Sequence, residues 1–201
     1  MKKVVIITGA SSGIGKALAA KYASEKFAVV LAARDMEKLQ EVEKHLSSQT
    51  EVLSVKCDVS IEADCKNLID QTFKKFSRID VLINNAGISM RAVFNDTDLS
   101  VIRKLMDINF WGAVYCTKYA LPSVRSRKGV IAGISSIAGY RGLPARTGYS
   151  ASKFALQGFL EALRTELLHT GVHVMWVSPG FTSSNIRNVA RSSDGSAQAE
   201  T

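Results

Sequence analysis

Tyr149 and Lys153 are the two side chains of this sequence whose types and spacing best suit proton transfer. On a helix, positions i and i+4 lie on one face about a turn apart, so the phenol and the ammonium could share one site. A nearby cation favours phenolate and lowers a pKa that is ordinarily about 10, which would let tyrosine exchange protons near neutral pH. Tyr22 and Lys26 have the same spacing, so only the surrounding residues can decide which pair has a function.

A glycine-rich segment, Thr8–Gly15 (TGASSGIG), follows the first apolar run of the chain. Glycines allow a tight turn and a close approach of the backbone to a pyrophosphate, which would then lie at the N-terminus of the next helix. The glycine spacing differs from the common Gly-x-Gly-x-x-Gly pattern, but its position after a strand still predicts a dinucleotide site. A Walker A loop is excluded, because the glycine spacing before Lys16 is wrong and Ala17 has no hydroxyl for Mg²⁺.

The end of the second apolar run bears on which dinucleotide would bind. In such folds an acid about 20 residues after the glycine turn accepts the ribose 2′-hydroxyl of NAD, whereas an arginine suits the 2′-phosphate of NADP. Ala33 occupies the expected acid position and Arg34 follows it, which favours NADP over NAD. Asp35 keeps NAD as the alternative, since a shift of one residue would bring a carboxylate near the ribose.

Composition limits the class of protein further. The 201 residues are 46% hydrophobic and 22% charged, as expected for a single globular domain of residues 1–201 with a loose tail at 192–201. No stretch approaches 18 consecutive apolar residues, so we expect a cytoplasmic protein without an integral membrane segment. The net charge of +8 comes from basic residues scattered along the chain, with no basic run interleaved with aromatics, and we expect no nucleic-acid partner.

The cysteines and histidines do not suggest a metal centre. Cys57, Cys65 and Cys116 are an odd number without metal-binding spacing, so we expect reduced thiols. The three histidines form no ligand cluster, and no metal site is predicted.

Apolar, β-branched runs alternate with amphipathic stretches along the whole chain. The expected strands are Val4–Thr8, Ala28–Ala33, Glu51–Cys57, Val81–Ile83, Gly129–Ile134 and Val172–Val177. The expected helices are Ile14–Lys26, Met36–Ser47, Glu62–Phe76, Leu99–Ser126 and Tyr149–His169. This alternation predicts an α/β fold with a doubly wound, Rossmann-like parallel sheet and helices on both faces.

Further motifs follow the strands in a characteristic order. They are Asn84–Gly87 (NNAG) after the fourth strand, Asn109 in the long helix, Ser136 at the end of the fifth strand, and Pro179 with Gly180 after the sixth. Together with the glycine segment and the YSASK segment at Tyr149–Lys153, this set resembles the short-chain dehydrogenase/reductase family from Lys3 to about Arg187. Tyr22 and Lys26 fall in the first helix, away from the strand ends where such sheets bind ligands, so they are expected to be surface residues.

The resemblance implies roles for the matching residues. Tyr149 would be the general acid that protonates the substrate carbonyl, and the base in the reverse reaction. Lys153 would hold the nicotinamide ribose and keep the Tyr149 pKa low, and Ser136 would hydrogen-bond the carbonyl oxygen. Asn109 would anchor a water linking Lys153 to solvent. The residues expected to bind the dinucleotide are Gly9, Ser11, Ser12, Gly13, Ile14, Gly15, Arg34, Asp58, Val59, Asn85, Ala86, Gly87, Tyr149, Lys153, Pro179, Gly180 and Thr182. The loops that hold substrate in this family contain Met90, Phe94, Tyr140, Arg141, Leu143 and Phe181 here.

The sequence departs from the family pattern near its C-terminus, because it ends where a seventh strand and closing helices usually follow. We therefore expect one open sheet edge at the sixth strand. The leading hypothesis is an NADP(H)-dependent oxidoreductase that interconverts a carbonyl and an alcohol, forming a homodimer or homotetramer as the resemblance implies. The alternative is a non-catalytic dinucleotide-binding module, and a sugar-nucleotide epimerase is a poorer third option. The sequence does not indicate the substrate.

Overall fold

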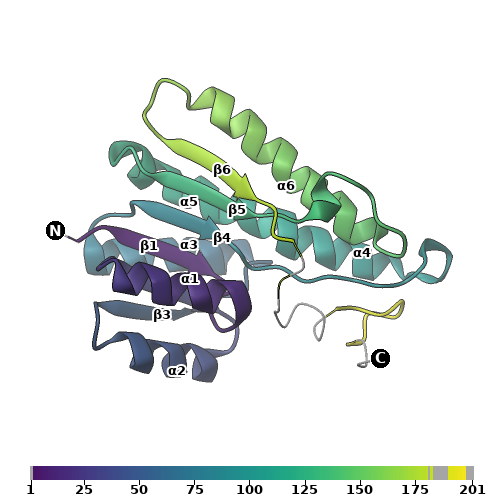
Figure 1. The fold of residues 1–201 in the computed structure, drawn as a ribbon, viewed down its shortest axis with the longest axis horizontal. Helices are drawn as coiled ribbons and strands as arrows, with labels where there is room; N and C mark the ends of the chain where they lie inside the picture. The colour runs from purple at the N-terminus through teal and green to yellow at the C-terminus, as the bar shows by residue number, and fades with distance from the viewer. Residues whose placement is uncertain (1, 181, 183–189, 198–201) are drawn as a thin grey trace.

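The computed structural model describes residues 2–180, 182 and 190–197, and within them the predicted doubly wound α/β architecture is confirmed. Six parallel strands form one sheet in the order β3-β2-β1-β4-β5-β6 (Figure 1). Their bounds are β1 (Val4–Thr8), β2 (Ala28–Ala33), β3 (Val52–Lys56), β4 (Val81–Asn84), β5 (Val130–Ile134) and β6 (His173–Val177). β1 pairs with β2 on one side and with β4 on the other, so the strand order reverses there.

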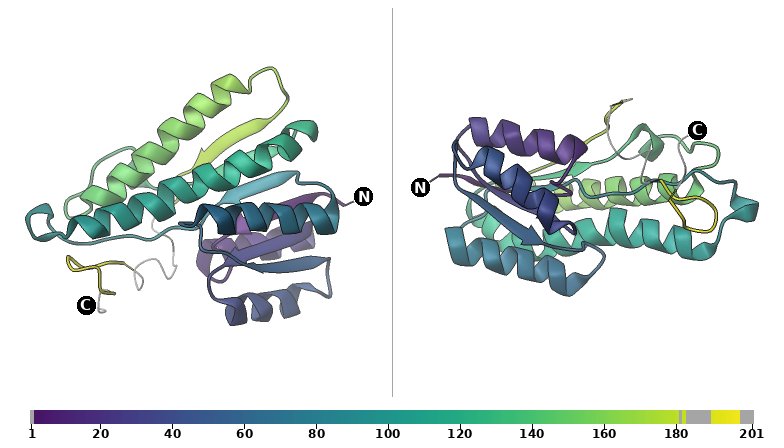
Figure 2. Two further views of the ribbon diagram at one scale, coloured as in Figure 1. Left: turned by 180° about the vertical axis from the view of Figure 1, so that it is seen from behind. Right: turned by 90° about the horizontal axis from the view of Figure 1, so that it is seen from below.

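Helices cover both faces of the sheet (Figures 1 and 2). Their bounds are α1 (Gly13–Ser24), α2 (Met36–Leu46), α3 (Glu62–Phe76), α4 (Leu99–Met106), α5 (Gly112–Ser126) and α6 (Thr147–Glu166). Leu39, Val42 and Leu46 of α2 pack with α1 on one face, while α3, α5 and α6 bury their apolar sides on the other. Alternate strand residues such as Val5 and Ile6 point into these two separate cores, because successive side chains of a strand face opposite sides.

The long helix predicted over Leu99–Ser126 is not continuous. A π-helical turn, η2 (Asp107–Trp111), separates α4 from α5. Such turns insert one residue into the helical repeat and are common at functional sites. The last long helix begins at Thr147, two residues before its predicted start at Tyr149. Two short 3₁₀ turns, η1 (Phe94–Asp96) and η3 (Ile137–Gly139), were not predicted.

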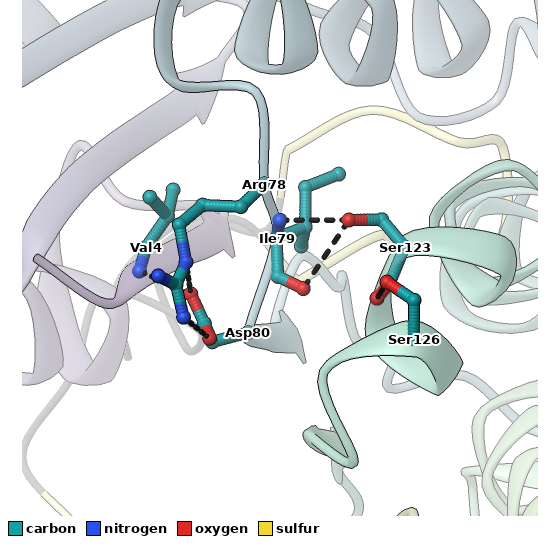
Figure 3. A network of polar contacts seen from close by, with 6 residues as sticks. All are labelled: Val4, Arg78, Ile79, Asp80, Ser123 and Ser126. Atoms are coloured by element: carbon teal, nitrogen blue, oxygen red, sulfur yellow. Dashed lines mark hydrogen bonds and ion pairs between the residues drawn. The ribbon is translucent and has the colours of Figure 1, made fainter. Parts of the chain in front are cut away.

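A polar network holds together the amino ends of the central strands, opposite the edge where ligands bind in such sheets (Figure 3). The buried Asp80 carboxylate accepts hydrogen bonds from the Val4 backbone N–H at 2.8 Å and from the Arg78 Nε at 2.8 Å. Beside it, the Ile79 backbone N–H donates to the Ser123 Oγ of α5 at 2.8 Å. The network therefore ties β1, the start of β4 and α5 to one another.

The C-terminal residues that the structure describes contact the loop after β4. The Arg191 backbone N–H donates to the Ser89 carbonyl at 2.9 Å, and the Asp98 N–H donates to the Ser193 carbonyl at 2.8 Å. The tail expected to be loose thus begins with ordered contacts at 192–197, and residues 198–201 lie outside the described part. Within the described residues β6 is one of the two edge strands, with β3 at the other edge, as expected for β6. No helix among them is long and apolar enough to cross a bilayer.

Candidate active site

A cavity of about 690 Å³ opens at the carboxyl ends of the strands and runs from the end of β2 to the start of α6. The predicted site residues that line it are Gly9, Ser11, Ser12, Gly13, Ile14, Arg34, Asp58, Val59, Asn85, Ala86, Gly87, Ser136, Tyr149, Lys153, Pro179, Gly180 and Thr182. Gly15 and Asn109 do not line the cavity, but they contact residues that do: Gly15 lies against Gly9, and Asn109 bonds to Ile88. Seven segments far apart in the sequence therefore meet around one space.

The glycine segment forms the tight turn that its sequence predicts. Gly9 and Gly13 have φ values of +66° and +53°, which side chains other than glycine rarely adopt. A Cβ on Gly15 would lie 2.3 Å from the Gly9 carbonyl oxygen, so Gly15 lets α1 approach the turn closely. Ser12 precedes α1, but its side chain makes no capping hydrogen bond to the helix. The first N–H groups of α1 thus face the cavity in the arrangement that suits a pyrophosphate.

The turn is held in place by the loop that follows β4. The Thr8 Oγ1 accepts hydrogen bonds of 3.0 Å from the backbone N–H groups of both Asn85 and Ala86. In return, the Asn85 side-chain amide donates to the carbonyls of Thr8 at 2.8 Å and Gly9 at 3.2 Å. Asn85 and Thr8 therefore lock together the two loops at the point where the strand order reverses.

The end of the cavity beside β2 carries charged side chains of both signs. Arg34 and Lys38 are both exposed and both line the cavity. Asp35 caps α2: its Oδ1 accepts from the Lys38 backbone N–H at 3.1 Å, and its Oδ2 lies 3.0 Å from the Lys38 Nζ. The hydrogen bond and charge of Lys38 lower the pKa of Asp35. This carboxylate is thus occupied by the helix end, and Arg34 is left without an acidic partner among the described residues.

Asp58 and Val59 form the neighbouring wall after β3. The Asp58 Oδ1 accepts from the Ser60 backbone N–H at 3.0 Å and from its hydroxyl at 2.7 Å, which fixes the carboxylate at the cavity edge. Pro179, Gly180 and Thr182 border the opposite side, next to the end of β6. Phe181, assigned from sequence to a substrate loop, lies outside the described residues.

The structure distinguishes the two serines at the end of β5. The buried Ser135 Oγ accepts a 2.8 Å hydrogen bond from the Gln157 side chain of α6. The Ser136 Oγ instead caps η3 by accepting from the Ala138 N–H at 3.2 Å, and its hydroxyl lies against the Tyr149 phenol, where it lowers the phenol's pKa. Ser136 is therefore the serine beside Tyr149, as the sequence spacing predicted.

Tyr149 is the third residue of α6, and only 7% of its surface is exposed to solvent. Burial raises its pKa above the ordinary value, and this outweighs the lowering by Ser136 and by the charge of Arg146. The prediction that Lys153 keeps this pKa low is therefore wrong for the unliganded protein. The Lys153 Nζ lies 5.8 Å from the centre of the Tyr149 ring.

Lys153 is buried on the same face of α6, one turn after Tyr149. Its Nζ donates a 2.8 Å hydrogen bond to the Ile134 carbonyl at the end of β5. Burial lowers its pKa to about 8, so the ammonium is still the main form at neutral pH but loses its proton far more readily than that of an ordinary lysine. The remaining N–H groups of a lysine held in this way can donate hydrogen bonds to hydroxyl groups of a bound ligand.

Asn109 lies in the π-helical turn and clamps the loop after β4. Its Oδ1 accepts from the Ile88 N–H at 2.8 Å, and its Nδ2 donates to the Ile88 carbonyl and the Ser152 Oγ, each at 2.9 Å. A Cβ on Gly87 would come within 3.2 Å of the Asn109 Oδ1 and 3.5 Å of the Lys153 Nζ, so these side chains flank one glycine. The water relay assigned to Asn109 stays a prediction.

The cavity wall also contains residues that were not predicted from sequence, among them Lys38, Ser89 and Arg146. The Arg146 guanidinium lies 6.0 Å from the centre of the Tyr149 ring and donates to the Ser89 Oγ. The positions of two of them were partly indicated by the sequence. Arg146 is three residues before Tyr149 and Lys38 is four residues after Arg34, and residues at these spacings on a helix lie close together.

Several residues of the suggested substrate loops lie elsewhere. Leu143 lines the cavity, whereas Met90 is fully buried in the core and does not. Phe94, Tyr140 and Arg141 are exposed outside the wall. Tyr22 also lies away from the cavity, packed edge-on against Phe27 with ring centres 5.0 Å apart.

Comparison with known proteins identifies the family. The model of the short chain dehydrogenases matches residues 3–195. The chain belongs to the short-chain dehydrogenase family. Similar curated proteins of this family include "11-beta-hydroxysteroid dehydrogenase A" of Sesamum indicum, 42% identical over 92% of this chain and 53% of that protein. Another is "11-beta-hydroxysteroid dehydrogenase-like 4A" of Arabidopsis thaliana, 41% identical over 92% of this chain and 63% of that protein. The chain thus spans between half and two thirds of the length of these relatives.

Solved structures of short-chain dehydrogenases share the fold. A member from Burkholderia phymatum in complex with NAD superposes with a TM-score of 0.89 and 29% identity, over 92% of this chain and 68% of that one. The alcohol dehydrogenase of Thermococcus sibiricus, complexed with 5-hydroxy-NADP, gives a TM-score of 0.86 and 26% identity, over 90% of this chain and 77% of that one. One neighbour contains NAD and the other an NADP derivative, so the fold alone does not select between the two cofactors.

Within the described residues, no group of three or more histidine, cysteine, aspartate or glutamate side chains is arranged to hold a metal ion. All three cysteines are free thiols and buried. The absence of a metal site stays a prediction for the chain as a whole.

Proposed function

We propose that this chain carries the dinucleotide site and the catalytic residues of an NADP(H)-dependent oxidoreductase that interconverts a carbonyl and an alcohol. One observation carries the proposal: Ser136, Tyr149 and Lys153 line the same cavity as the glycine turn. The relatives named as hydroxysteroid dehydrogenases support this class of reaction.

The residues present fit a dinucleotide along the length of the cavity. The turn at Gly9 and Gly13 lines the cavity where its backbone N–H groups would meet the pyrophosphate, Asp58 would bind the adenine end, and Lys153 would hold the nicotinamide ribose. Pro179, Gly180 and Thr182 would border the nicotinamide. When bound, the reduced cofactor supplies a hydride. The chain's own contribution is to orient the carbonyl and to transfer the proton.

The protonation of Tyr149 suits the reductive direction. Because burial raises its pKa, the phenol stays protonated at neutral pH and can donate its proton to the substrate oxygen. Ser136 adds a second hydroxyl beside the phenol, placed to hydrogen-bond that oxygen as negative charge develops.

An activity screen tests the reaction class. Protein with NADPH is offered ketones, aldehydes, steroids and acyl-chain carbonyl compounds, and cofactor oxidation is followed by absorbance. We expect oxidation with at least one class. Tight NADPH binding without any oxidation would support the non-catalytic binding module instead.

For the cofactor, we propose NADP because Arg34 and Lys38 flank the place where a ribose phosphate would lie, while Asp35 is engaged by α2. Replacing Arg34 by alanine should weaken NADPH binding about 10- to 100-fold, the loss of one charge-assisted hydrogen bond, and leave NADH binding unchanged. Titrations of both cofactors measure this. Arg125→Ala, on the exposed end of α5, is the control. Equal affinity of the unmutated protein for NADPH and NADH would overturn the assignment.

We also propose that the chain forms a homodimer or homotetramer in the cytoplasm. Large apolar side chains are exposed on the helices of one side of the sheet: Leu99 of α4 is 62% exposed and Phe154 of α6 is 47% exposed. α4 and α6 pack beside each other, so both side chains belong to one side of the molecule. The mass of the protein in solution tests the oligomer, with a monomer at all concentrations as the contrary result.

A further inference from the structure

Arg146 is a positively charged group in the cavity wall without a carboxylate partner. It is half-buried, precedes the first residue of α6, and takes part in none of the ion pairs found among residues 2–180, 182 and 190–197. A guanidinium has five N–H donors, and the one side-chain acceptor that Arg146 meets in this part of the chain is the Ser89 hydroxyl. A partly desolvated cation in this state favours an anionic acceptor.

The rest of this end of the cavity does not supply that acceptor. The two acids that line the cavity, Asp35 and Asp58, follow β2 and β3, on the far side of β1 from β5 and β6. Each already accepts hydrogen bonds from its own neighbourhood. The second cation near Tyr149, Lys153, is turned toward the Ile134 carbonyl. The charge beside Tyr149 is therefore positive and uncompensated within the described residues.

The same end of the cavity also has an apolar wall. Ile137 of η3 and Leu143 of the following loop line it and are 44% and 39% exposed, so they are accessible to a ligand. A ligand that matches both features has an apolar body and one negatively charged group.

We propose that Arg146 binds a carboxylate of the substrate, and that the carbonyl compound reduced at Tyr149 is an apolar oxo acid. This inference rests on the proposed function, because it places the substrate in the same cavity. Ser89 holds the guanidinium on one side and the Tyr149 ring supports it on the other, so the group is pre-oriented before the ligand arrives. A steroid without a charged group would leave this cation unpaired.

Binding of matched acids and esters to the protein loaded with NADP⁺, which cannot deliver a hydride, tests the proposal independently of turnover. The probes are phenylglyoxylate, 4-oxo-4-phenylbutanoate and 5-oxo-5-phenylpentanoate, each with its methyl ester, which keeps the carbonyl and the ring but removes the charge. For at least one pair we expect the acid to bind about 10- to 100-fold more tightly than the ester. Arg146→Gln should remove this preference, Arg146→Lys should restore part of it, and Arg125→Gln should keep it.

Two results would overturn the role of Arg146. One is that no acid binds more tightly than its ester. The other is that Arg146→Gln weakens acid and ester equally, which would show that Arg146 only tethers Ser89. Failure of the proposed function is seen separately: preferential acid binding that depends on Arg146, without any NADPH oxidation, would support the anion site and contradict the reductase.

Discussion

At the scale of single residues, Tyr149 and Lys153 share one face of α6, but burial determines their protonation more than their mutual charge does. Burial raises the pKa of the phenol and lowers that of the ammonium to about 8, and both shifts favour the neutral forms. The sequence spacing predicted the neighbourhood correctly and the direction of the phenol shift wrongly. Desolvation depends on what covers a side chain, and residues distant in the sequence provide that cover.

The buried ammonium gives a pH-dependent prediction. Between pH 8 and about 10.5 the unfolded chain binds a proton on Lys153 that the folded chain has lost, so the free energy of unfolding should rise with pH across this window. Lys153→Met should remove that rise and stabilise the unliganded protein at pH 7 by about 2–3 kcal/mol, the size of the pKa shift less one hydrogen bond.

Thermal melts of both proteins from pH 7 to 9.5 measure this difference, in which the contributions of all other groups cancel. If the melting temperatures of the two proteins change with pH in parallel, the ammonium is not destabilised by burial and the explanation is wrong.

Arg146 is another single residue whose position could not be predicted. It is three residues before Tyr149, yet nothing in the sequence shows that its side chain turns toward the phenol and Ser89.

At the scale of elements, the positions of strands were predictable to within about a residue, because most of them are nearly continuous apolar runs, and β1, β2 and β4 are buried on both faces. The π-helical turn η2 was not predictable, since its residues fit the helical pattern on either side. The turn contains Asn109, whose amide meets both backbone groups of Ile88. The extra residue of the π-helical turn thus occurs where the Asn109 amide holds Ile88, a residue of the cavity wall.

The glycine turn leads to a prediction at this scale. Gly15→Ala should abolish dinucleotide binding, because its Cβ would lie 2.3 Å from the Gly9 carbonyl oxygen and 2.6 Å from the Asn85 Nδ2. Gly158→Ala is the matched control: it lies within α6, its Cβ would meet nothing within 4 Å, and alanine should stabilise the helix by about 0.5–1 kcal/mol. Cofactor titration and thermal melts measure both effects, and wild-type cofactor affinity in Gly15→Ala would contradict the account of the turn.

At the scale of the whole molecule, the amino ends and the carboxyl ends of the strands have different roles. The amino ends are tied together by the buried Asp80 network (Figure 3), and the carboxyl ends carry the cavity. The order of motifs along the chain was sufficient to predict which end carries the cavity, because parallel strands bring their C-terminal loops to one edge. It could not show that Asp35 caps α2 and pairs with Lys38, the contacts that leave Arg34 without an acidic partner among the described residues.

We propose that Tyr149 transfers the proton while the rest of the cavity binds the dinucleotide. Tyr149→Phe tests it most directly, because the change removes one hydroxyl and keeps the ring that packs beside Arg146 and Lys153. With a substrate found in the screen, hydride transfer from NADPH should fall at least about 100-fold, as expected for loss of a general acid, while NADPH affinity stays within a few fold. Turnover at the unmutated rate in Tyr149→Phe would contradict the account.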